Sequence, residues 1–559
     1  MDVQVKSEYR GHWTGNMAAG GGYKGKWTGR AFMANLSDRL QVGLSGAMNN
    51  LNGDMKADAN GNWTYSGYRS GWTTFRNTNL SLGWTNKDDK RAAGYQELNA
   101  SFNFNHDNRD YRSYTRQENI LPGQTKAWWY QRSRQNSMQQ VLSGGANYSV
   151  NLDTLTFLTL SFNLNRSRDD ADGVTRSATF HTNPTVRFPE ALADPLQLLL
   201  SDPIPAEVQA ILTNANYKPT EQFTTQHTYD ASARLSRRFG KADMLNVNAS
   251  WRRVSSRFRQ FNFYDLRYYT SGQEQREPQR QHARQDNASD YVSASASYDK
   301  SVGKKEWLTL NYRLDYRHND RLREYWNLER LAGWADLSTW PLTALPEGYR
   351  QMADLLLDSN SDDQLLRTLS HTGSLTFNSH REKWDIYLSG WVKAQHDRLD
   401  YARQVPMDTL LSQWTTTYGV NANLKWKFTE YTSLNLSGGY QIWEPDVSTR
   451  LSYTDTSNPE STVISNPNLK GGRTGNTSLS FNTFFEPQQL SLWADAYASF
   501  EQGATSRIMR YDNATGYYAY QNVNLHDLQY RAGGGGGMSV VLDQEKVWTF
   551  SYSPIQHEQ

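Results

Sequence analysis

Apolar and polar residues alternate with a period of two along most of this 559-residue chain. In the segment 98–105, Leu, Ala, Phe and Phe occupy every second position, and Asn or Ser occupies the positions between them. The segments 245–251, 308–316 and 418–428 repeat the pattern. Such alternation predicts β-strands with one apolar face and one polar face. Each segment has about ten residues, the length of a tilted strand that crosses a bilayer.

The connections between these strands alternate between short and long. Short turns are predicted at 37–39, 86–91, 151–153, 240–242, 303–306, 379–383, 429–431, 486–489 and 543–546. Long connections are predicted at 50–76, 105–138, 167–222, 258–288, 319–368, 397–413, 443–475 and 502–525. A soluble sandwich with one wet face would show the same alternation along its strands, but it has no reason to place every long loop on one side. We therefore predict an all-β fold, a transmembrane up-and-down antiparallel β-barrel with short periplasmic turns and long extracellular loops.

About 19 strands are readable in the sequence, from the first at 13–22 to the last at 547–553. Bacterial single-chain barrels close with an even number of strands, and the residues 554–559 form no strand that ends in an aromatic residue. We therefore expect 22 strands in the complete barrel. Residues 1–559 would then form one barrel domain that is incomplete at its C-terminus.

Two of the long extracellular loops, at 167–222 and 319–368, carry helical rather than strand patterns. Leucine, isoleucine and valine recur at helical spacing in 189–216, where prolines divide the run into short helices, and 349–357 has the same character. Apolar helices in a loop need burial. They can pack on one another, cover the barrel mouth or contact another protein, and packing within the loops is the favoured interpretation.

Composition agrees with a barrel that is apolar outside and polar inside. Aromatic residues make up 13% of the chain although its mean hydropathy is −0.80, which argues against disorder. No run approaches the roughly 18 apolar residues of a membrane-spanning helix. The 59 basic and 57 acidic residues give no electrostatic argument for nucleic acid, and we interpret the basic stretch 276–284 as a solvated loop. The chain has no cysteine, so disulfides and thiolate sites are excluded.

Two acidic segments are weak candidates for binding calcium. In 169–173 and 358–363, carboxylate and amide oxygens recur at alternate positions, where hard ligands for calcium can point inward together. The candidate ligands are Asp170, Asp172, Asp358, Asn360 and Asp362. The second segment lacks the glycine and the final glutamate of a complete calcium loop, so solvated acidic turns are the alternative. No other metal or cofactor is expected.

An aromatic cluster gives the candidate contact site for a ligand or partner. Trp128, Trp129 and Tyr130 are predicted to lie in a loop or at its root. An aromatic girdle at the membrane interface is the first interpretation, and a platform that stacks on a sugar or peptide is the second. No catalytic motif is present: the sequence contains neither a His-Glu-x-x-His pattern nor a Gly-x-Ser-x-Gly elbow. We therefore do not expect an enzyme.

The N-terminal stretch resembles a known family. Residues 3–11 form a short alternating run, and a Trp-Thr-Gly-Asn sequence at 13–16, a Gly-rich stretch at 19–22 and Asn-Asn-Leu-Asn at 49–52 follow it. This resembles the start of the barrel in the outer-membrane β-barrel family of Bacteroidetes TonB-dependent receptors, directly after the plug. The resemblance is confined to residues 1–55. Beyond them only the rhythm of the strands agrees.

The resemblance implies a 22-stranded barrel in the bacterial outer membrane that captures a ligand and imports it. Residues 1–11 would be the transition from plug to barrel. A plug and a signal peptide would both precede residue 1, and TonB would act through the plug. The expected surroundings are the lipid bilayer and lipopolysaccharide, with a surface lipoprotein or other assembly subunits as further partners and no nucleic acid. The alternative function is a non-transporting barrel subunit of a multi-protein outer-membrane assembly, held by the helical loops.

Overall fold

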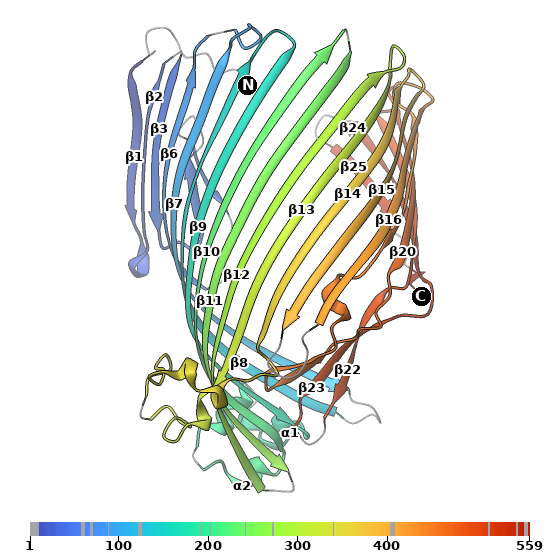
Figure 1. Cartoon of the computed structure of the whole chain (residues 1–559). Coiled ribbons are helices and arrows are strands. Elements are labelled where there is room, and N and C mark those ends of the chain that lie inside the picture. Colours follow the sequence, from blue (N-terminus) through green and yellow to red (C-terminus); the bar gives the residue numbers. More distant parts are fainter. Residues whose placement is uncertain are drawn as a thin grey trace.

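The computed structural model contains one large antiparallel sheet curved into a barrel (Figure 1). The structure describes residues 11–37, 39–57, 62–66, 71–87, 89–120, 126–191, 193–201, 203–240, 242–270, 273–338, 340–402, 409–512, 515–543, 546–552 and 557–558. The N-terminal residues 1–10, most of the predicted transition from plug to barrel, lie outside this part of the chain.

Nineteen strands of the main sheet follow one another in sequence order, each paired antiparallel with the next. They are β1 (Trp13–Gly21), β2 (Trp27–Leu36), β3 (Leu40–Asn49), β6 (Trp72–Thr85), β7 (Gln96–Ile120), β8 (Lys126–Asn151), β9 (Thr156–Phe180), β10 (Leu212–Phe239), β11 (Asp243–Thr270), β12 (Gln273–Ser301), β13 (Glu306–Asn327), β14 (Asp362–His380), β15 (Trp384–Ala402), β16 (Thr409–Lys427), β17 (Ser433–Trp443), β20 (Gly472–Phe485), β21 (Leu490–Gln502), β24 (Gln529–Asp543) and β25 (Lys546–Tyr552). The two-residue β26 (His557–Glu558) also pairs with β24. The predicted all-β meander and its strand count are confirmed.

Smaller elements lie in the connections. The short strands are β4 (Asp54–Ala57), β5 (Trp63–Ser66), β18 (Thr454–Asn458), β19 (Ser461–Ile464), β22 (Thr505–Tyr511) and β23 (Tyr518–Asn524). The helices are α1 (Pro184–Arg187), α2 (Ala206–Gln209), η2 (Tyr23–Gly25), η3 (Pro189–Ala191), η4 (Pro195–Leu199), η5 (Leu328–Arg330), η6 (Tyr349–Gln351), η7 (Ala353–Leu355) and η8 (Val447–Arg450). None of these helices in the described ranges is long and apolar enough to cross a membrane.

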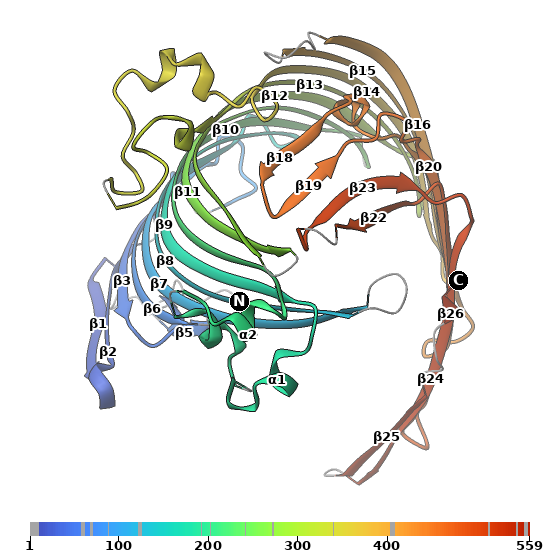
Figure 2. The same ribbon diagram turned by 90° about the horizontal axis from the view of Figure 1, so that it is seen from below.

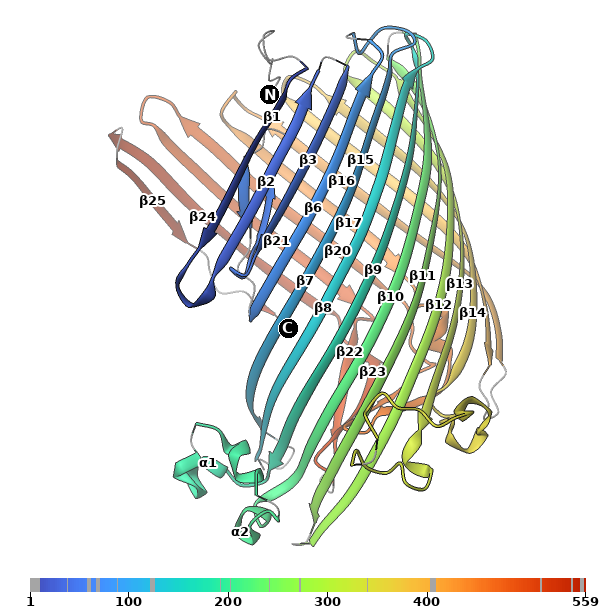
Figure 3. The same ribbon diagram turned by 90° about the vertical axis from the view of Figure 1, so that its left-hand side faces the viewer.

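The sheet is open along one seam. Among the described residues, β1 pairs only with β2, and β25 pairs only with β24. These two edges face each other across a gap when the barrel is seen from below or from the side (Figures 2 and 3). The number of 22 strands in a closed barrel stays a prediction.

The register places apolar residues in rows on the outer face of the sheet. Leu235 of β10 lies opposite Leu158 of β9 and Val247 of β11, and the row continues through Ala296 of β12 to Tyr312 of β13. Large apolar side chains of this face are exposed over many neighbouring strands. Because successive side chains of a strand point to opposite faces, this row follows from the alternation seen in the sequence.

The adjacent row on the inner face is polar. Ser236, Asn246, Ser297, Asn311 and Ser374 lie opposite one another across β10 to β14. The Ser236 hydroxyl donates to the side-chain oxygen of Asn246 at 2.7 Å. The inner wall therefore presents hydroxyl and amide groups, which agrees with the predicted polar lumen.

The six strands from β7 to β12 are much longer than the sequence predicts. They contain 25 to 29 residues, whereas a tilted strand needs about 9–11 residues to cross a bilayer. The exposed large apolar side chains of β10 are Tyr229, Leu235 and Phe239, all in the second half of the strand. The first half of β10 therefore extends beyond the apolar band. Both faces of these extensions carry polar residues, so no alternation marks them as strands, although their backbone groups continue the ladder.

The two rims of the barrel differ as predicted. The short turns lie at one rim, at the top of Figure 1, and each predicted short turn joins two neighbouring strands. The extended hairpins lie at the other rim. The predicted loops 167–222 and 319–368 are correspondingly shorter, at 181–211 and 328–361, because the strands continue. The stretch 276–284, predicted as a loop, lies within β12 for the same reason.

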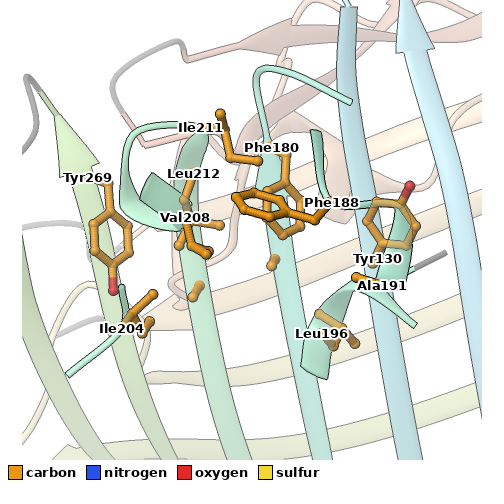
Figure 4. Packing of buried hydrophobic residues seen from close by; sticks show 12 residues of the cluster. Tyr130, Phe180, Phe188, Ala191, Leu196, Ile204, Val208, Ile211, Leu212 and Tyr269 are labelled. Atoms are coloured by element: carbon orange, nitrogen blue, oxygen red, sulfur yellow. The ribbon is translucent and has the colours of Figure 1, made fainter. Parts of the chain in front are cut away.

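The predicted short helices of 189–216 are confirmed, and their loop packs on the barrel itself. Ala178 and Phe180 occupy even positions of β9, on the same outer face as Leu160. Leu196 and Val208 of the loop pack against them in a buried cluster (Figure 4). The apolar side chains of loop 181–211 are thus buried against the outer face of the extended hairpins.

Loop 328–361 is also attached to the outer face, where it lies outside the ring of strands in Figure 2. The His282 ring stacks between Phe261 and Trp326, with ring centroids 4.4 and 5.1 Å away, and the ring of Tyr349 from the loop contacts it edge-on. The buried Arg280 side chain donates to the Pro341 carbonyl oxygen at 2.6 Å. Both helical loops therefore bury their apolar residues on the barrel, and neither crosses its mouth.

The asparagine-rich run 49–52 begins at the last residue of β3 and bonds to the first residues of β2 and β6. Asn50 accepts a hydrogen bond from the Trp27 amide at 2.8 Å, and Asn52 accepts one from the Thr73 amide at 2.9 Å. Asn52 has a φ of 63°, a left-handed conformation that asparagine adopts more readily than most residues. Asn49 is fully buried and accepts from the Leu51 amide. The run is therefore a structural corner at the rim.

Candidate functional site

A second sheet lies across the extended rim of the barrel. It contains β18, β19, β23 and β22 in that order, and Figure 2 shows it inside the arc of the main strands. Its strands come from two connections, 444–471 and 503–528, which join where β19 and β23 pair in parallel from Ser461 opposite Tyr518. We call these four strands the mouth sheet. The sequence analysis missed it because its strands are short and their partners are distant in sequence.

One side of the mouth sheet is held by an ion-pair network on the inner wall. Arg323 of β13 lies 2.5 Å from Asp362 of β14 and 3.1 Å from Asp455 of β18. Arg321 pairs with Asp362 at 3.1 Å. Burial opposes ionisation of Asp455, but hydrogen bonds from Ser457 and the charge of Arg323 outweigh it and keep the pKa of Asp455 below its ordinary value.

A second bond on the same side is made by an amide. The buried Asn360 side chain accepts a hydrogen bond from the backbone amide of Thr456 at 3.0 Å. The root of this connection is held by apolar contacts as well, because Val447 and Leu451 pack against the buried Leu399 and Tyr401 of β15. Polar and apolar contacts together join the connection 444–471 to the wall formed by β13 to β15.

The other side of the mouth sheet contacts the wall formed by β9 to β11. The Ser177 hydroxyl donates to the Glu460 carboxylate at 3.2 Å. The Asn214 side-chain amide donates to the Thr515 carbonyl oxygen at 2.5 Å. Glu460 lies in the turn between β18 and β19, so one hairpin touches both walls. The mouth sheet therefore bridges the opening instead of lining one side of it.

The contact with β10 and β11 is dehydrated. The ammonium group of Lys218 lies 4.6 Å from the centre of the Tyr264 ring, and Tyr517 packs against Tyr268 with the ring centroids 6.0 Å apart. Burial lowers the pKa of Lys218, although the Glu460 carboxylate opposes this, and burial raises the pKa values of Tyr264 and Tyr517. Low solvent access explains all three shifts. Side chains beside the mouth sheet are thus packed directly against this wall.

Below the mouth, the inner wall carries many side-chain amide and hydroxyl groups. The side chains of Asn77 and Asn105 are joined at 2.6 Å, as are those of Asn79 and Asn103. A hollow of about 650 Å³ opens beside them. Its polar lining consists of Gln41, Ser45, Asn79, Ser81, Asn99, Ser101, Asn147, Ser161 and Asn163. This surface can exchange hydrogen bonds with an uncharged polar molecule.

The predicted aromatic residues lie at the start of a strand, at the root of the connection between β7 and β8. Trp128, Trp129 and Tyr130 belong to β8, in the part that extends beyond the apolar band. Tyr130 is fully buried beside Phe180, with ring centroids 5.9 Å apart, and Trp128 packs against the same cluster. Trp129 points to the opposite face by alternation. Two of the three residues are therefore packing residues that hold loop 181–211, and a contact of Trp129 with a ligand or partner stays a prediction.

The predicted calcium ligands are engaged by nitrogen donors. Asp170 and Asp172 lie in β9, where Arg168 pairs with Asp170 at 2.6 Å and the Asn136 amide donates to Asp172 at 3.0 Å. The prediction of a turn at 169–173 was wrong, since this stretch is an extended strand.

In the second segment, Asp358 and Asn360 precede β14, which begins at Asp362. Asn360 and Asp362 are both engaged at the mouth sheet, as described above. Within the described ranges, no three His, Cys, Asp or Glu side chains converge in a way that could hold a metal ion. Calcium binding is left as a prediction of the sequence.

Comparison with known proteins gives structural likeness without close sequence relatives. No family model and no curated protein matches the chain. The chain is similar to the ferric yersiniabactin uptake receptor FyuA from Yersinia pestis, at 10% identity and a TM-score of 0.34, over 97% of this chain and 78% of that one. It is similar to the ferric-catecholate import receptor Fiu from E. coli K12 at 11% identity and a TM-score of 0.43, over 97% and 77%.

A further similar structure is the Serratia marcescens hemophore receptor HasR in complex with its hemophore HasA and heme. The identity is 10% and the TM-score 0.42, over 98% of this chain and 64% of that one. All three values of the TM-score are low. Assignment of a function therefore depends on the residues of this chain.

Proposed function

We propose that this chain is the barrel of an outer-membrane transporter, which takes up a polar ligand at the mouth sheet and passes it through the lumen. One observation supports this most strongly. Neighbouring rows of the same strands are apolar on the outer face and rich in amides and hydroxyls on the inner face, and the mouth above the polar face is bridged by two long connections.

The apolar rows support placement in a bilayer. Leu310, Val392 and Val420 belong to neighbouring or nearby strands, and their side chains are 53 to 60% exposed. Soluble proteins rarely expose continuous apolar surfaces of this size. Lipid contact accounts for them, with the short turns toward the periplasm and the extended hairpins outside the cell.

The inner wall supports an uncharged, hydrogen-bonding ligand. Some charged side chains that face the lumen are paired: Arg313 lies 2.8 Å from Asp315, and Arg252 lies 3.4 Å from Asp230. The polar remainder is Asn, Gln, Ser and Thr, whose groups can both donate and accept. A neutral oligosaccharide or an uncharged peptide satisfies such groups.

Energised import through TonB is part of the proposal. It is supported by the resemblance of residues 1–55 to the start of TonB-dependent barrels, including the asparagine run 49–52 at the rim. A plug would couple the barrel to TonB, and a surface lipoprotein is a further partner consistent with that resemblance. The alternative, a subunit of a non-transporting assembly, was motivated by the apolar helices in the loops. Those helices are buried on the barrel's own outer face. They therefore no longer argue for a partner protein.

Uptake in cells tests the proposal. Radiolabelled neutral oligosaccharides, uncharged tetrapeptides and ferric siderophores are supplied to strains with and without the gene, in the presence or absence of a protonophore. We expect uptake of a neutral probe that requires the gene and stops with the protonophore. Equal uptake by both strains for every probe would refute transport, and uptake that resists the protonophore would refute the TonB coupling.

Two variants connect that result to the lumen. Asn103→Leu removes an inner-wall amide that is bonded to Asn79 at 2.6 Å, and Leu80→Ile changes an exposed outer-face residue on β6 while keeping its apolar character. We expect slower uptake with the first and normal uptake with the second. Equal rates for both variants would contradict a path along this wall.

A further inference from the structure

A hollow with an arginine-rich lining lies on the outer face of the extended hairpins. It has a volume of about 760 Å³ and is bounded by β10, β11, β12 and loop 328–361. Its charged or titratable lining residues are His227, Arg257, Arg259, Arg284, Asp286 and Arg350. Arginines from two strands and one loop therefore meet in one concave site, which the transport path does not use.

Strand alternation places these side chains outside the barrel. Val247 and Trp251 are exposed outer-face residues of β11, and Arg257 and Arg259 follow at positions of the same parity. On β12, Val292 is exposed on the outer face, and Arg284 shares its parity. Because side chains two residues apart lie on one face of a strand, the hollow faces the surroundings of the barrel and not its lumen.

The hollow carries more positive than negative charge. Among its described lining residues Asp286 is the one carboxylate; Arg257 and Arg284 pair with it, and Arg284 also pairs with Glu324 at 3.5 Å. Arg259 and Arg350 form no ion pair within the part of the chain that the structure describes. The guanidinium of Arg259 lies 5.6 Å from the centre of the Phe223 ring. Arg259 thus faces the hollow without an ion pair among the described residues, and Arg350 is influenced only through space by Glu324 and Asp286.

The buried His282 beside the hollow responds to this charge. Burial is the main reason that its pKa falls to about 4, and the nearby positive charges of Arg259, Arg350 and Arg284 lower it further, against a hydrogen bond with the Gln260 carbonyl. The three arginines act on one point although they come from different elements. Their side chains therefore create a shared positive potential.

The height of the hollow above the apolar band fits the region of lipid headgroups. Trp251 is the last exposed apolar residue on the outer face of β11, and Arg257 follows six positions later. At roughly 3.3 Å per residue and a tilt of about 45°, six residues rise about 14 Å. A tryptophan at the membrane interface with arginines beyond it is the arrangement that reaches the polar parts of lipids.

We propose that this hollow binds a phosphate group, held by Arg259 and Arg350 with Arg257 and Arg284 beside them. Planar guanidinium groups match phosphate oxygens in pairs, and several converging arginines favour a doubly charged group over a carboxylate. The phosphate can belong to a glycolipid headgroup of the outer leaflet or to a soluble molecule. The lipid source depends on the proposed membrane placement, whereas binding of phosphate itself does not.

Native mass spectrometry of the full purified chain in detergent tests the site. The probes are phosphorylated lipid A, the same lipid A after enzymatic dephosphorylation, and inorganic pyrophosphate as a soluble competitor. The test variant is Arg259→Gln with Arg350→Gln. The matched control is Arg317→Gln, which removes an exposed arginine from the inner face of β13. Heat-modifiable migration in gels checks that each variant is folded.

We expect phosphorylated lipid A to bind the double variant at least tenfold more weakly than the wild type, with no change in the Arg317→Gln control. Displacement by millimolar pyrophosphate would support a site for phosphate in general, and resistance to it would support a site for the lipid. Equal binding of dephosphorylated lipid A, or unchanged binding by the folded double variant, would overturn the proposal. Ligand uptake by the double variant should remain normal, which separates this site from the transport path.

Discussion

Replacement of Arg323 by glutamine should release the mouth sheet from one wall of the barrel. Arg323 bridges two carboxylates, Asp362 on the wall and Asp455 on the mouth sheet, at 2.5 and 3.1 Å. The substitution removes both ion pairs and keeps a polar side chain of moderate size. Asp362 retains Arg321 as a partner at 3.1 Å, whereas Asp455 loses its ion pair to the wall. The attachment of β18 is therefore weakened more than the wall.

The expected magnitude follows from burial. The side chain of Asp362 is 1% exposed and that of Arg323 is 15% exposed. Removing one partner from a buried pair costs about 3–5 kcal/mol, and the remaining Arg321 together with partial exposure of Asp455 reduces this to about 2 kcal/mol. Since about 1.4 kcal/mol corresponds to a factor of ten, the detached population of the mouth sheet should rise roughly 30-fold.

Thiol labelling measures this population. The chain has no cysteine of its own, so Asn360→Cys introduces a single thiol at a position on the same wall as Arg323 that is 1% exposed and contacts Thr456 of the mouth sheet. In this background, Arg323→Gln should raise the labelling rate by a maleimide reagent about 30-fold. Arg317→Gln, six residues away on the same strand and exposed, should leave the rate unchanged.

Refutation is equally direct. If a maleimide labels the cysteine at position 360 at the same rate in the Arg323→Gln and Arg317→Gln variants, while denaturant exposes it fully in both, the ion pairs do not hold the mouth sheet. Heat-modifiable migration must be normal in both variants, so that faster labelling is not caused by a disrupted barrel.

Two further predictions concern the loops on the outer face. The pKa of buried His282 is about 4 in place of 6.5. Its contribution to the attachment of loop 328–361 is therefore complete above pH 6.5. As the pH falls toward 4, this contribution decreases by about 3 kcal/mol. A spin label at position 347 should become mobile over this range, and His282→Phe should abolish the response; a label that stays immobile to pH 4 would contradict it. Leu196→Ala empties a site that is 4% exposed and should cost about 3 kcal/mol, so trypsin should cleave loop 181–211 faster. Leu200→Ala, at a position that is 62% exposed, should leave cleavage unchanged, and equal rates for both variants would contradict the packing.

The sequence predicts the barrel wherever the two faces of a strand differ in polarity. In β11 the segment 245–251 alternates apolar and polar residues, and its strand, face and turn were all predicted correctly. The continuation of the same strand through Arg257 and Arg259 has polar residues on both faces. Polarity then carries no periodic signal, so the extension was interpreted as a loop, although backbone pairing with its neighbours continues.

The candidate site was not readable because it depends on distant pairing. Ser461 and Tyr518 lie opposite each other in the mouth sheet although many residues and two barrel strands separate them in the chain. The aromatic residues around Trp128 drew attention by their composition alone, but register decides that Tyr130 is buried in a cluster. The pairing of short strands, and the face to which a single side chain points, depend on tertiary contacts. No local sequence pattern records these contacts.

Cysteine accessibility at two neighbouring positions of β12 tests the central claim most directly. Ser295 faces the lumen and is half-buried, whereas Ala296 lies on the outer face and is exposed in the absence of lipid. In outer-membrane fragments with a charged, membrane-impermeant thiol reagent on both sides, Ser295→Cys should be labelled and Ala296→Cys should be protected. In detergent, which replaces the lipid with a small micelle around the apolar band, Ser295→Cys should still be labelled faster than Ala296→Cys. Rapid labelling of Ala296→Cys in the membrane, with slower labelling of Ser295→Cys, would contradict a lipid-facing exterior around a polar lumen.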